Sequence, residues 1–253
     1  MEIFVLKSDE VAAITRGTHG NPHHILGMHQ CLNDCYVNAY LPRATAAFVL
    51  RINEETGEPI FKYPMTEIGS QGFFTVKIED SGAFAYKLIT EGEQAAEFYD
   101  PYSFGYSVDP VNVMKVVNGD DGILSDFHVK DLFGARQITL DGVQGVSFCM
   151  NMPGATRVSV VGDFNGWDGR VNPMRRIDYT DMFELFIPGD LMNTRYKFEA
   201  LYRDGNTDIF ADPYAEVYEV APGNASVLAK LEYSWSDSSY MKKRQCICPG
   251  KYI

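Results

Sequence analysis

Hydrophobic and polar residues alternate in short runs along most of the chain. The clearest runs are "FTVKI" (74–78) and "FAYKLIT" (84–90) in the first half, and "RVSVVG" (157–162), "MFELFI" (182–187) and "RYKFEALY" (195–202) in the second. Alternation with this period predicts strands that bury one face. Turn-forming segments such as "EETGEP" and "RDGN" separate the runs, and no helical pattern alternates with them. We therefore expect antiparallel β-sandwiches and not an α/β barrel.

The chain repeats one pattern at a nearly constant offset. The segment "YVNAYLPRATAAFVL" (36–50) is echoed by "VSFCMNMPGATRVSVVG" (146–162). Further matches follow in the same order: Pro64-Met65 with Pro173-Met174, Phe73 with Phe183, Tyr86 with Tyr196, and Asp100-Pro101-Tyr102 with Asp212-Pro213-Tyr214. The offsets run from 109 (174 − 65) to 112 (214 − 102). This regularity indicates a duplicated unit.

The duplication predicts an all-β protein of two tandem domains. We expect one sandwich over residues 1–110, a connecting segment over 111–138, a second sandwich over 139–236 and a tail over 237–253. The connecting segment is rich in Gly and acidic residues, and its pattern allows one short helix near 125–133.

Composition narrows the choice of partner. The 253 residues include 34 acidic and 22 basic side chains, for a formal net charge of −12. Nucleic acids and anionic membranes require a basic surface, so we expect neither as a partner. The N-terminal "MEIFVLKSDEVAAI" lacks the basic and apolar segments of a secretory signal, and no apolar run reaches the length of a bilayer. We expect a cytoplasmic protein with a neutral ligand.

Cysteine and histidine positions raise the question of a zinc site. The five cysteines, an odd number, are Cys31, Cys35, Cys149, Cys246 and Cys248, and we expect them to be reduced. The first two lie within seventeen residues of sequence that also hold His19, His23, His24 and His29. The CxxC spacing of zinc sites is missing. We therefore predict no metal and no cofactor, and assign Cys149 to the core.

Trp167 is the most informative single residue. It lies in "VVGDFNGWDGRVNPM" (160–174), among Gly, Asp and Asn residues that favour exposed turns. An indole in such a segment can serve as a ligand platform, fold back into the core, or mark a fold whose function is lost. The residues alone leave these alternatives open. The other tryptophan, Trp235, is expected to pack against the last strand.

Longer segments carry a family resemblance. The second half resembles carbohydrate-binding module family 48, an early-set immunoglobulin-like domain of α-glucan enzymes, in "MPGATRVSVVGDFNGWDGRVNPM", "FELFIPG", "RYKFEALYRDG" and "ADPYAEVYE". "GTHGNPHHILGMH" (17–29) and "LFGARQITLDGVQGVSF" (132–148) resemble the two N-terminal domains of bacterial glycogen branching enzymes, in the same order. The resemblance implies two tandem immunoglobulin-like (early set) antiparallel β-sandwiches.

The resemblance also implies a sugar site. In related modules the residue matching Trp167 stacks on glucose and the one matching Lys197 donates to hydroxyl groups; Asn165 and Asn224 are weaker polar candidates. The first copy has "RINEETGEP" where the second has "VGDFNGWDG", and Ile209 stands where related modules place a second aromatic residue. A site with one aromatic residue predicts a dissociation constant on the order of millimolar.

The branching-enzyme catalytic barrel is missing from this sequence. A (β/α)8 barrel needs about 250 residues, and the repeats already occupy the chain. Four carboxylates, Asp163, Asp168, Asp181 and Glu184, are expected in turns or on exposed strand faces, which are poor places for glycosidase acids. We predict a non-catalytic module that binds α-1,4-glucan such as glycogen. The alternative is a structural fragment or split subunit that docks a catalytic barrel and binds no sugar; a regulatory interaction module is a third hypothesis.

Overall fold

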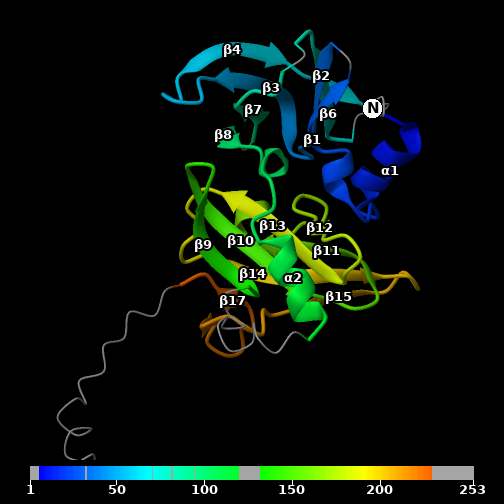
Figure 1. Ribbon diagram of the computed structural model, residues 1–253, viewed down its shortest axis with the longest axis vertical. Helices are drawn as coiled ribbons and strands as arrows, with labels where there is room; N and C mark the ends of the chain where they lie inside the picture. The colour runs from blue at the N-terminus through cyan, green and yellow to red at the C-terminus, as the bar shows by residue number, and fades with distance from the viewer. Residues whose placement is uncertain are drawn as a thin grey trace, which may run out of the picture.

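The computed structural model describes residues 6–31, 33–69, 71–80, 82–93, 95–119 and 132–229. These residues form two β-sandwiches, and the connection between them carries helix α2 (Pro110–Val117) (Figure 1). The predicted all-β fold of two sandwiches is confirmed. Within the described ranges, no helix has the length and apolarity needed to cross a membrane.

The first sandwich consists of two four-stranded antiparallel sheets, in the orders β1-β2-β6-β5 and β4-β3-β7-β8. Helix α1 (Ser8–Arg16) precedes it. Inward side chains such as Val37, Val49 and Leu88 form its core. The strands are β1 (Gly27–Cys31), β2 (Asp34–Tyr40), β3 (Ala44–Ile52), β4 (Pro59–Pro64), β5 (Thr66–Ile68), β6 (Phe73–Ile78), β7 (Tyr86–Gly92) and β8 (Ala96–Tyr99).

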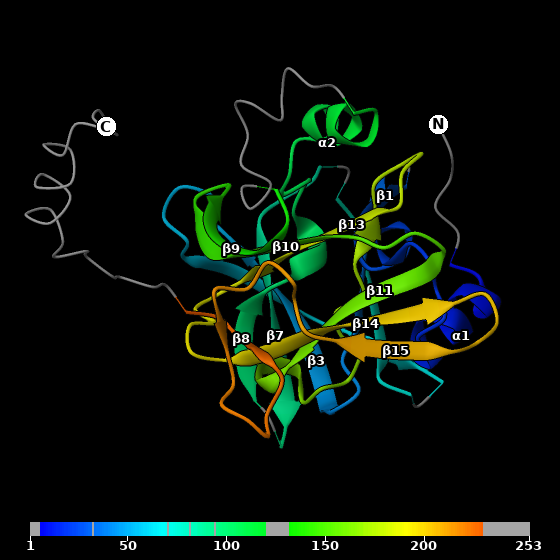
Figure 2. The same cartoon turned by 90° about the horizontal axis from the view of Figure 1, so that it is seen from below.

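The second sandwich repeats this plan. One sheet has the order β12-β13-β10-β9; the other has the order β11-β14-β17-β16, with β15 beside β14 (Figure 2). Phe148, Tyr196 and Phe198 are fully buried between the sheets. The strands are β9 (Gly134–Leu140), β10 (Val143–Asn151), β11 (Ala155–Gly162), β12 (Arg175–Arg176), β13 (Met182–Pro188), β14 (Arg195–Tyr202), β15 (Thr207–Phe210), β16 (Val217–Tyr218) and β17 (Ser226–Val227).

The connection differs from the sequence-based expectation. Strand β9 begins at Gly134, so the boundary placed at residue 139 falls inside it. The helix lies at Pro110–Val117, where Asp109 caps it by accepting from the Val111 N–H at 2.9 Å. Residues 132 and 133 are not helical, and 125–131, which complete the expected helix, lie outside the described residues, as do Trp235 and the 237–253 tail.

The duplication is visible in one buried contact that occurs twice. The Tyr86 hydroxyl donates to Asp100 at 2.6 Å, and the Tyr196 hydroxyl donates to Asp212 at the same distance. Each carboxylate also accepts the backbone N–H two residues on. All four side chains are at most 3% exposed. The recurring Asp-Pro-Tyr therefore ends each repeat with a carboxylate that a core tyrosine holds in place.

Asp100 gives the fold a specific pH dependence. Burial raises the pKa of Asp100 to about 6, so from about pH 4 to pH 6 the native state keeps a proton that the unfolded chain releases. The stability this proton contributes is complete below the unfolded pKa and is lost as pH rises through 6. We measure the free energy of unfolding in urea at pH values from 4 to 7. Over this range we expect that of the wild type to fall by roughly 3 kcal/mol relative to that of Asp100→Asn. If the free energy of unfolding changed with pH in the same way in the wild type and in Asp100→Asn, this prediction would be wrong. Asp178→Asn is the control, because Asp178 is exposed.

Candidate functional site

The turn after β11 is held by the side chain of Asn165. Its Oδ1 accepts from the N–H groups of Gly162 (2.9 Å) and Trp167 (3.2 Å). Its Nδ2 donates to the Val160 carbonyl and to Asn172 Oδ1, both at 2.8 Å. Two donors and two acceptor sites are all that an amide offers, and the side chain is 3% exposed. Asn165 therefore organises the turn from within and is not part of the binding surface proposed below.

Trp167 follows in an unusual backbone conformation. Gly166 and Trp167 both lie in the left-handed region, at φ values of 65° and 63°. For a bulky residue this conformation costs about 1–3 kcal/mol and persists only when its surroundings enforce it. The indole Nε1–H donates to Asp163 Oδ1 at 3.2 Å, and the side chain is 38% exposed. The turn thus fixes an indole at the surface.

A charged network supports the indole from one side. The Arg195 guanidinium donates to both oxygens of Asp163, each at 2.9 Å, and to Glu219 at 3.1 Å. The hydrogen bonds from Arg195 hold the pKa of Asp163 below its usual range. Asp163 is therefore ionised at neutral pH and serves as a fixed acceptor for Trp167, not as a proton donor.

Lys197 and Asn224 are brought together. Lys197 lies on β14, opposite Val161 of β11, and its Nζ donates to Asn224 Oδ1 at 2.5 Å. Its neighbours Tyr196 and Phe198 point into the core, so Lys197 lies on the outer face of the sheet. Ile209, on β15, is 54% exposed. The outer face therefore carries the predicted lysine and asparagine, with an aliphatic side chain where related modules place an aromatic one.

The opposite side of the Trp167 turn contacts the first sandwich. Arg43 donates from Nη2 to the Asn165 carbonyl at 2.5 Å. Its guanidinium lies so close to Gly166 that a Cβ there would be 2.8 Å from Nη1. The Arg170 guanidinium lies over the ring of Tyr40, 5.7 Å from its centroid. The turn is consequently part of the seam between the two sandwiches.

Tyr102 extends this seam. Its hydroxyl lies 3.2 Å from the carbonyl oxygens of Val171 and Pro173 in the second sandwich. The ring of His23 meets that of Tyr102 edge-on, with 5.0 Å between centroids. Burial lowers the pKa of His23 to about 2, so this imidazole is neutral in the folded protein at any ordinary pH.

The four carboxylates considered from sequence are each engaged in ion pairs. Asp163 pairs with Arg195, Asp168 with Arg170, Asp181 with Arg176 and Glu184 with Arg175. The expectation that all four lie in turns or on exposed faces is wrong for Glu184, which is fully buried. Glu184 also accepts from the N–H and hydroxyl of Ser107, at 3.0 and 2.5 Å. Glu184 thus binds the chain just before helix α2 to strand β13.

The histidines and cysteines considered as zinc ligands have other contacts. The Cys35 thiol lies 2.9 Å from the Asp80 carbonyl oxygen, and His29 Nε2 lies 3.1 Å from the Leu26 carbonyl oxygen. His24 Nε2 lies 3.1 Å from Asn21 Nδ2. Over the described part of the chain, no three His, Cys, Asp or Glu side chains are grouped so as to hold a metal ion.

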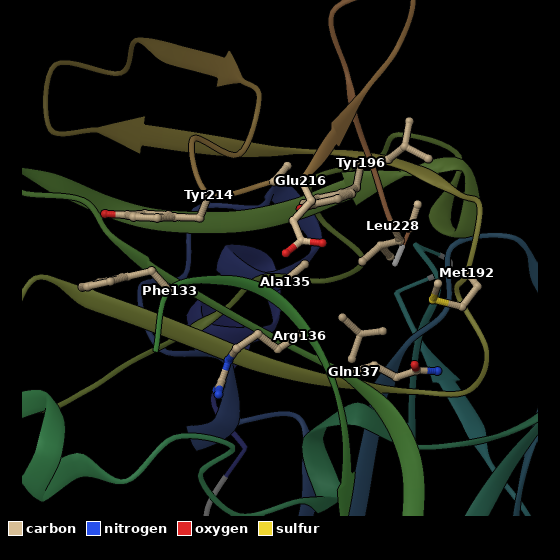
Figure 3. Close-up of a pocket in the computed structure, with 13 residues that line it drawn as sticks. Phe133, Ala135, Arg136, Gln137, Met192, Tyr196, Tyr214, Glu216 and Leu228 are labelled. Carbon is tan, nitrogen blue, oxygen red and sulfur yellow. The ribbon is translucent and has the colours of Figure 1, made fainter. Parts of the chain in front are cut away.

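A cavity of about 440 Å³ lies elsewhere on the second sandwich, between β9 and the loop after β15. Figure 3 shows Phe133 parallel to Tyr214, and the distance between their ring centroids is 5.1 Å. Arg136 of β9 and Glu216, in the loop before β16, also line the cavity. In the same loop region Tyr218 and Val220 are 45% and 90% exposed. Sequence reasoning missed this cavity, because it used Asp212-Pro213-Tyr214 only as a marker of the repeat.

Comparison with known proteins gives two family matches. Residues 7–102 match the N-terminal domain of alpha-1,4-glucan branching enzyme GlgB, and residues 132–215 match carbohydrate-binding module 48 (isoamylase N-terminal domain). The 1,4-alpha-glucan branching enzyme GlgB of Paramagnetospirillum magneticum is 35% identical over 94% of this chain and 31% of its own length. The GlgB of Pseudomonas fluorescens is 37% identical over 93% of this chain and 31% of its own length. The chain spans about a third of the length of these relatives.

Among solved structures, the pullulanase of Paenibacillus barengoltzii in complex with maltohexaose and alpha-cyclodextrin aligns with 30% of this chain and 12% of its own. The identity is 32% and the TM-score is 0.28.

Removing the Asn165 side chain should loosen the whole turn. Asn165→Ala removes the side-chain partner of the Gly162 N–H, the Val160 carbonyl and Asn172 Oδ1, and one of the two acceptors of the Trp167 N–H. We therefore expect a loss of about 2–3 kcal/mol in the free energy of unfolding. Urea unfolding followed by tryptophan fluorescence measures it. Asn206→Ala is the control, because Asn206 lies in an exposed turn with Asp204. Equal stability of the two variants would show that the turn does not depend on Asn165.

Proposed function

We propose that this chain, which corresponds to the N-terminal region of 1,4-alpha-glucan branching enzymes, binds α-glucan through the Trp167 turn and performs no catalysis itself. The observation that carries the proposal is the indole, which is fixed by Asn165 and Asp163 and still 38% exposed. A flat aromatic surface removes the apolar face of a glucose ring from water at about 25 cal/mol per Å².

Polar groups near the indole suit a neutral sugar. Lys197 and Asn224 form a donor and acceptor pair on the outer face, and the charges of Asp163 and Arg195 neutralise each other. Pre-organised groups lose little conformational entropy when a ligand binds. Because Trp167 is the one tryptophan or tyrosine of this site and Ile209 replaces a second aromatic residue, we expect a dissociation constant on the order of millimolar.

Calorimetric titration with maltoheptaose tests the proposal. We expect weak binding by the wild type, no measurable heat with Trp167→Ala, and about a fivefold weaker affinity with Lys197→Ala, because it loses one hydrogen bond to the sugar. Tyr179→Ala is the control, since that side chain is 98% exposed. Cellohexaose, which has the β linkage, should give no heat. A folded wild type that gives no heat with maltoheptaose would refute glucan binding.

A second candidate function is to dock the catalytic (β/α)8 barrel of a branching enzyme. A comparison of the two copies of the duplicated unit favours this docking function. Tyr102, at the end of the first repeat, reaches into the next domain with its hydroxyl, whereas its counterpart Tyr214 lies 37% exposed at the wall of the Figure 3 cavity. Tyr218 and Val220 are also exposed in this region. Exposed apolar groups gathered around a cavity are typical of interaction surfaces.

Association with a barrel can be measured directly. The part of the Paramagnetospirillum magneticum relative that this chain does not match is expressed alone and sedimented with this chain. We expect a complex that the double variant Tyr218→Ser/Val220→Ser weakens about tenfold, because it removes the apolar contact. Ile60→Ser/Phe61→Ser changes two equally exposed residues on β4 and should have no effect. Equal effects of the two double variants, or no complex with the wild type, would count against docking through this surface.

A further inference from the structure

A second groove lies against Trp167, and both sandwiches line it. Its volume is about 500 Å³. Arg16 and Thr18, at the end of α1, lie on one side of it, and Trp167, Glu199 and Thr207 of the second sandwich line the rest. Figure 2 shows α1 beside β14 and β15. Lys197 and Asn224 are not among its lining residues, so it is distinct from the outer-face pair.

Close packing fixes the relative position of its two walls. Helix α1 ends at Gly17 in the left-handed conformation, with φ of 68°, and the Gly17 N–H donates to the Ile14 carbonyl. A Cβ on Gly17 would lie 2.8 Å from Arg170 Cγ and 3.1 Å from Arg157 Nη1. Glycine at this position thus allows the helix end to lie directly on two arginines of the second sandwich, which places Arg16 and Thr18 at the groove.

The floor of the groove contains an incompletely satisfied arginine. Arg157 is 4% exposed and donates to the Gly169 carbonyl at 2.8 Å and to Glu199. Its Nε–H has no hydrogen-bond partner among the described residues. A buried donor without a partner costs about 1–3 kcal/mol. Arg157 therefore gives the groove a rigid lining that Gly169 and Glu199 hold in place.

The charges in the groove favour a neutral polyhydroxylated ligand. Arg157 and Glu199 are paired, and Arg170 donates twice to Asp168, at 2.9 and 2.7 Å. Of the charged side chains that line the groove, the exposed one of Arg16 is the one without an ion-pair partner among the described residues. The two pairs cancel each other's charge and present donors and acceptors in fixed positions, and the Arg16 guanidinium adds planar N–H donors that suit vicinal hydroxyl groups. The exposed indole at the rim supplies the apolar surface for a sugar ring.

We infer that the glucan bound at Trp167 extends into this groove, so that Arg16 and Thr18 of the first sandwich contact the sugar. The inference rests on the proposed function. It makes the binding site a composite of both sandwiches, with Trp167 at the rim of the groove beside α1, and with Lys197 of β14 and Asn224 of the β16–β17 loop as further contacts on the outer face. A bound chain then adds contacts across the seam that Arg43 and Tyr102 already make.

The test uses the full chain, maltoheptaose and calorimetry. We expect Arg16→Ala/Thr18→Val to weaken binding about tenfold, through the loss of one or two hydrogen bonds to the sugar. Arg203→Ala removes the same side chain type from an exposed turn that does not line the groove, and should bind as the wild type does. Both positions changed in the double variant are exposed, and thermal melts check that it stays folded. Arg16→Gln, which keeps a shorter, neutral side chain that can still donate hydrogen bonds, provides a milder second variant.

The outcomes separate the two proposals. If the wild type binds maltoheptaose and the groove variants bind equally well, the composite site is wrong while glucan binding at Trp167 stands. If the wild type is folded and gives no heat, both proposals fail. Weakening in the double variant, an intermediate effect in Arg16→Gln and none in Arg203→Ala support the composite site.

Discussion

The second sandwich's candidate site depends on four hydrogen bonds made by one buried amide. Asn165 joins the end of β11 to the turn that follows it, through Val160, Gly162, Trp167 and Asn172. These bonds hold the left-handed backbone at Trp167, together with the hydrogen bonds from Trp167 to the Gly162 carbonyl and to Asp163. The same geometry directs the Asn165 carbonyl toward Arg43. One side chain thus sets the position of the indole and the contact with the neighbouring domain.

This arrangement joins two explanations that the sequence left as alternatives. The Trp167 turn contacts the first sandwich through Arg43 and Arg170, as a packing role requires. It also leaves more than a third of the indole exposed, as a ligand platform requires. A turn that is fixed by a neighbouring domain loses less freedom on binding, so the two roles support each other.

Much of the fold could be predicted because it depends on local pattern. Alternating residues marked β11, β13 and β14, and the constant offset revealed the duplication before any contact was known. The errors at the candidate site involve long-range contacts. Glu184 is buried because Arg175 and the connecting residue Ser107 surround it, and Ser107 is 77 residues away. Nor does any local signal show that Asn165 faces inward, or that Arg43 reaches it from 122 residues away.

The duplication also explains how one copy came to support the other. Both copies keep the buried tyrosine and aspartate that complete the fold, with the same 2.6 Å contact. They differ at matched positions outside the core: Gly154 of the second copy has open space around it, whereas the first copy has Arg43 there. Arg43 donates a hydrogen bond to the Asn165 carbonyl in the turn that carries Trp167, and the first copy has no such turn of its own. Because the buried residues maintain the fold of each copy, the surface positions were free to diverge, and one copy now carries Arg43 while the other carries the exposed Trp167.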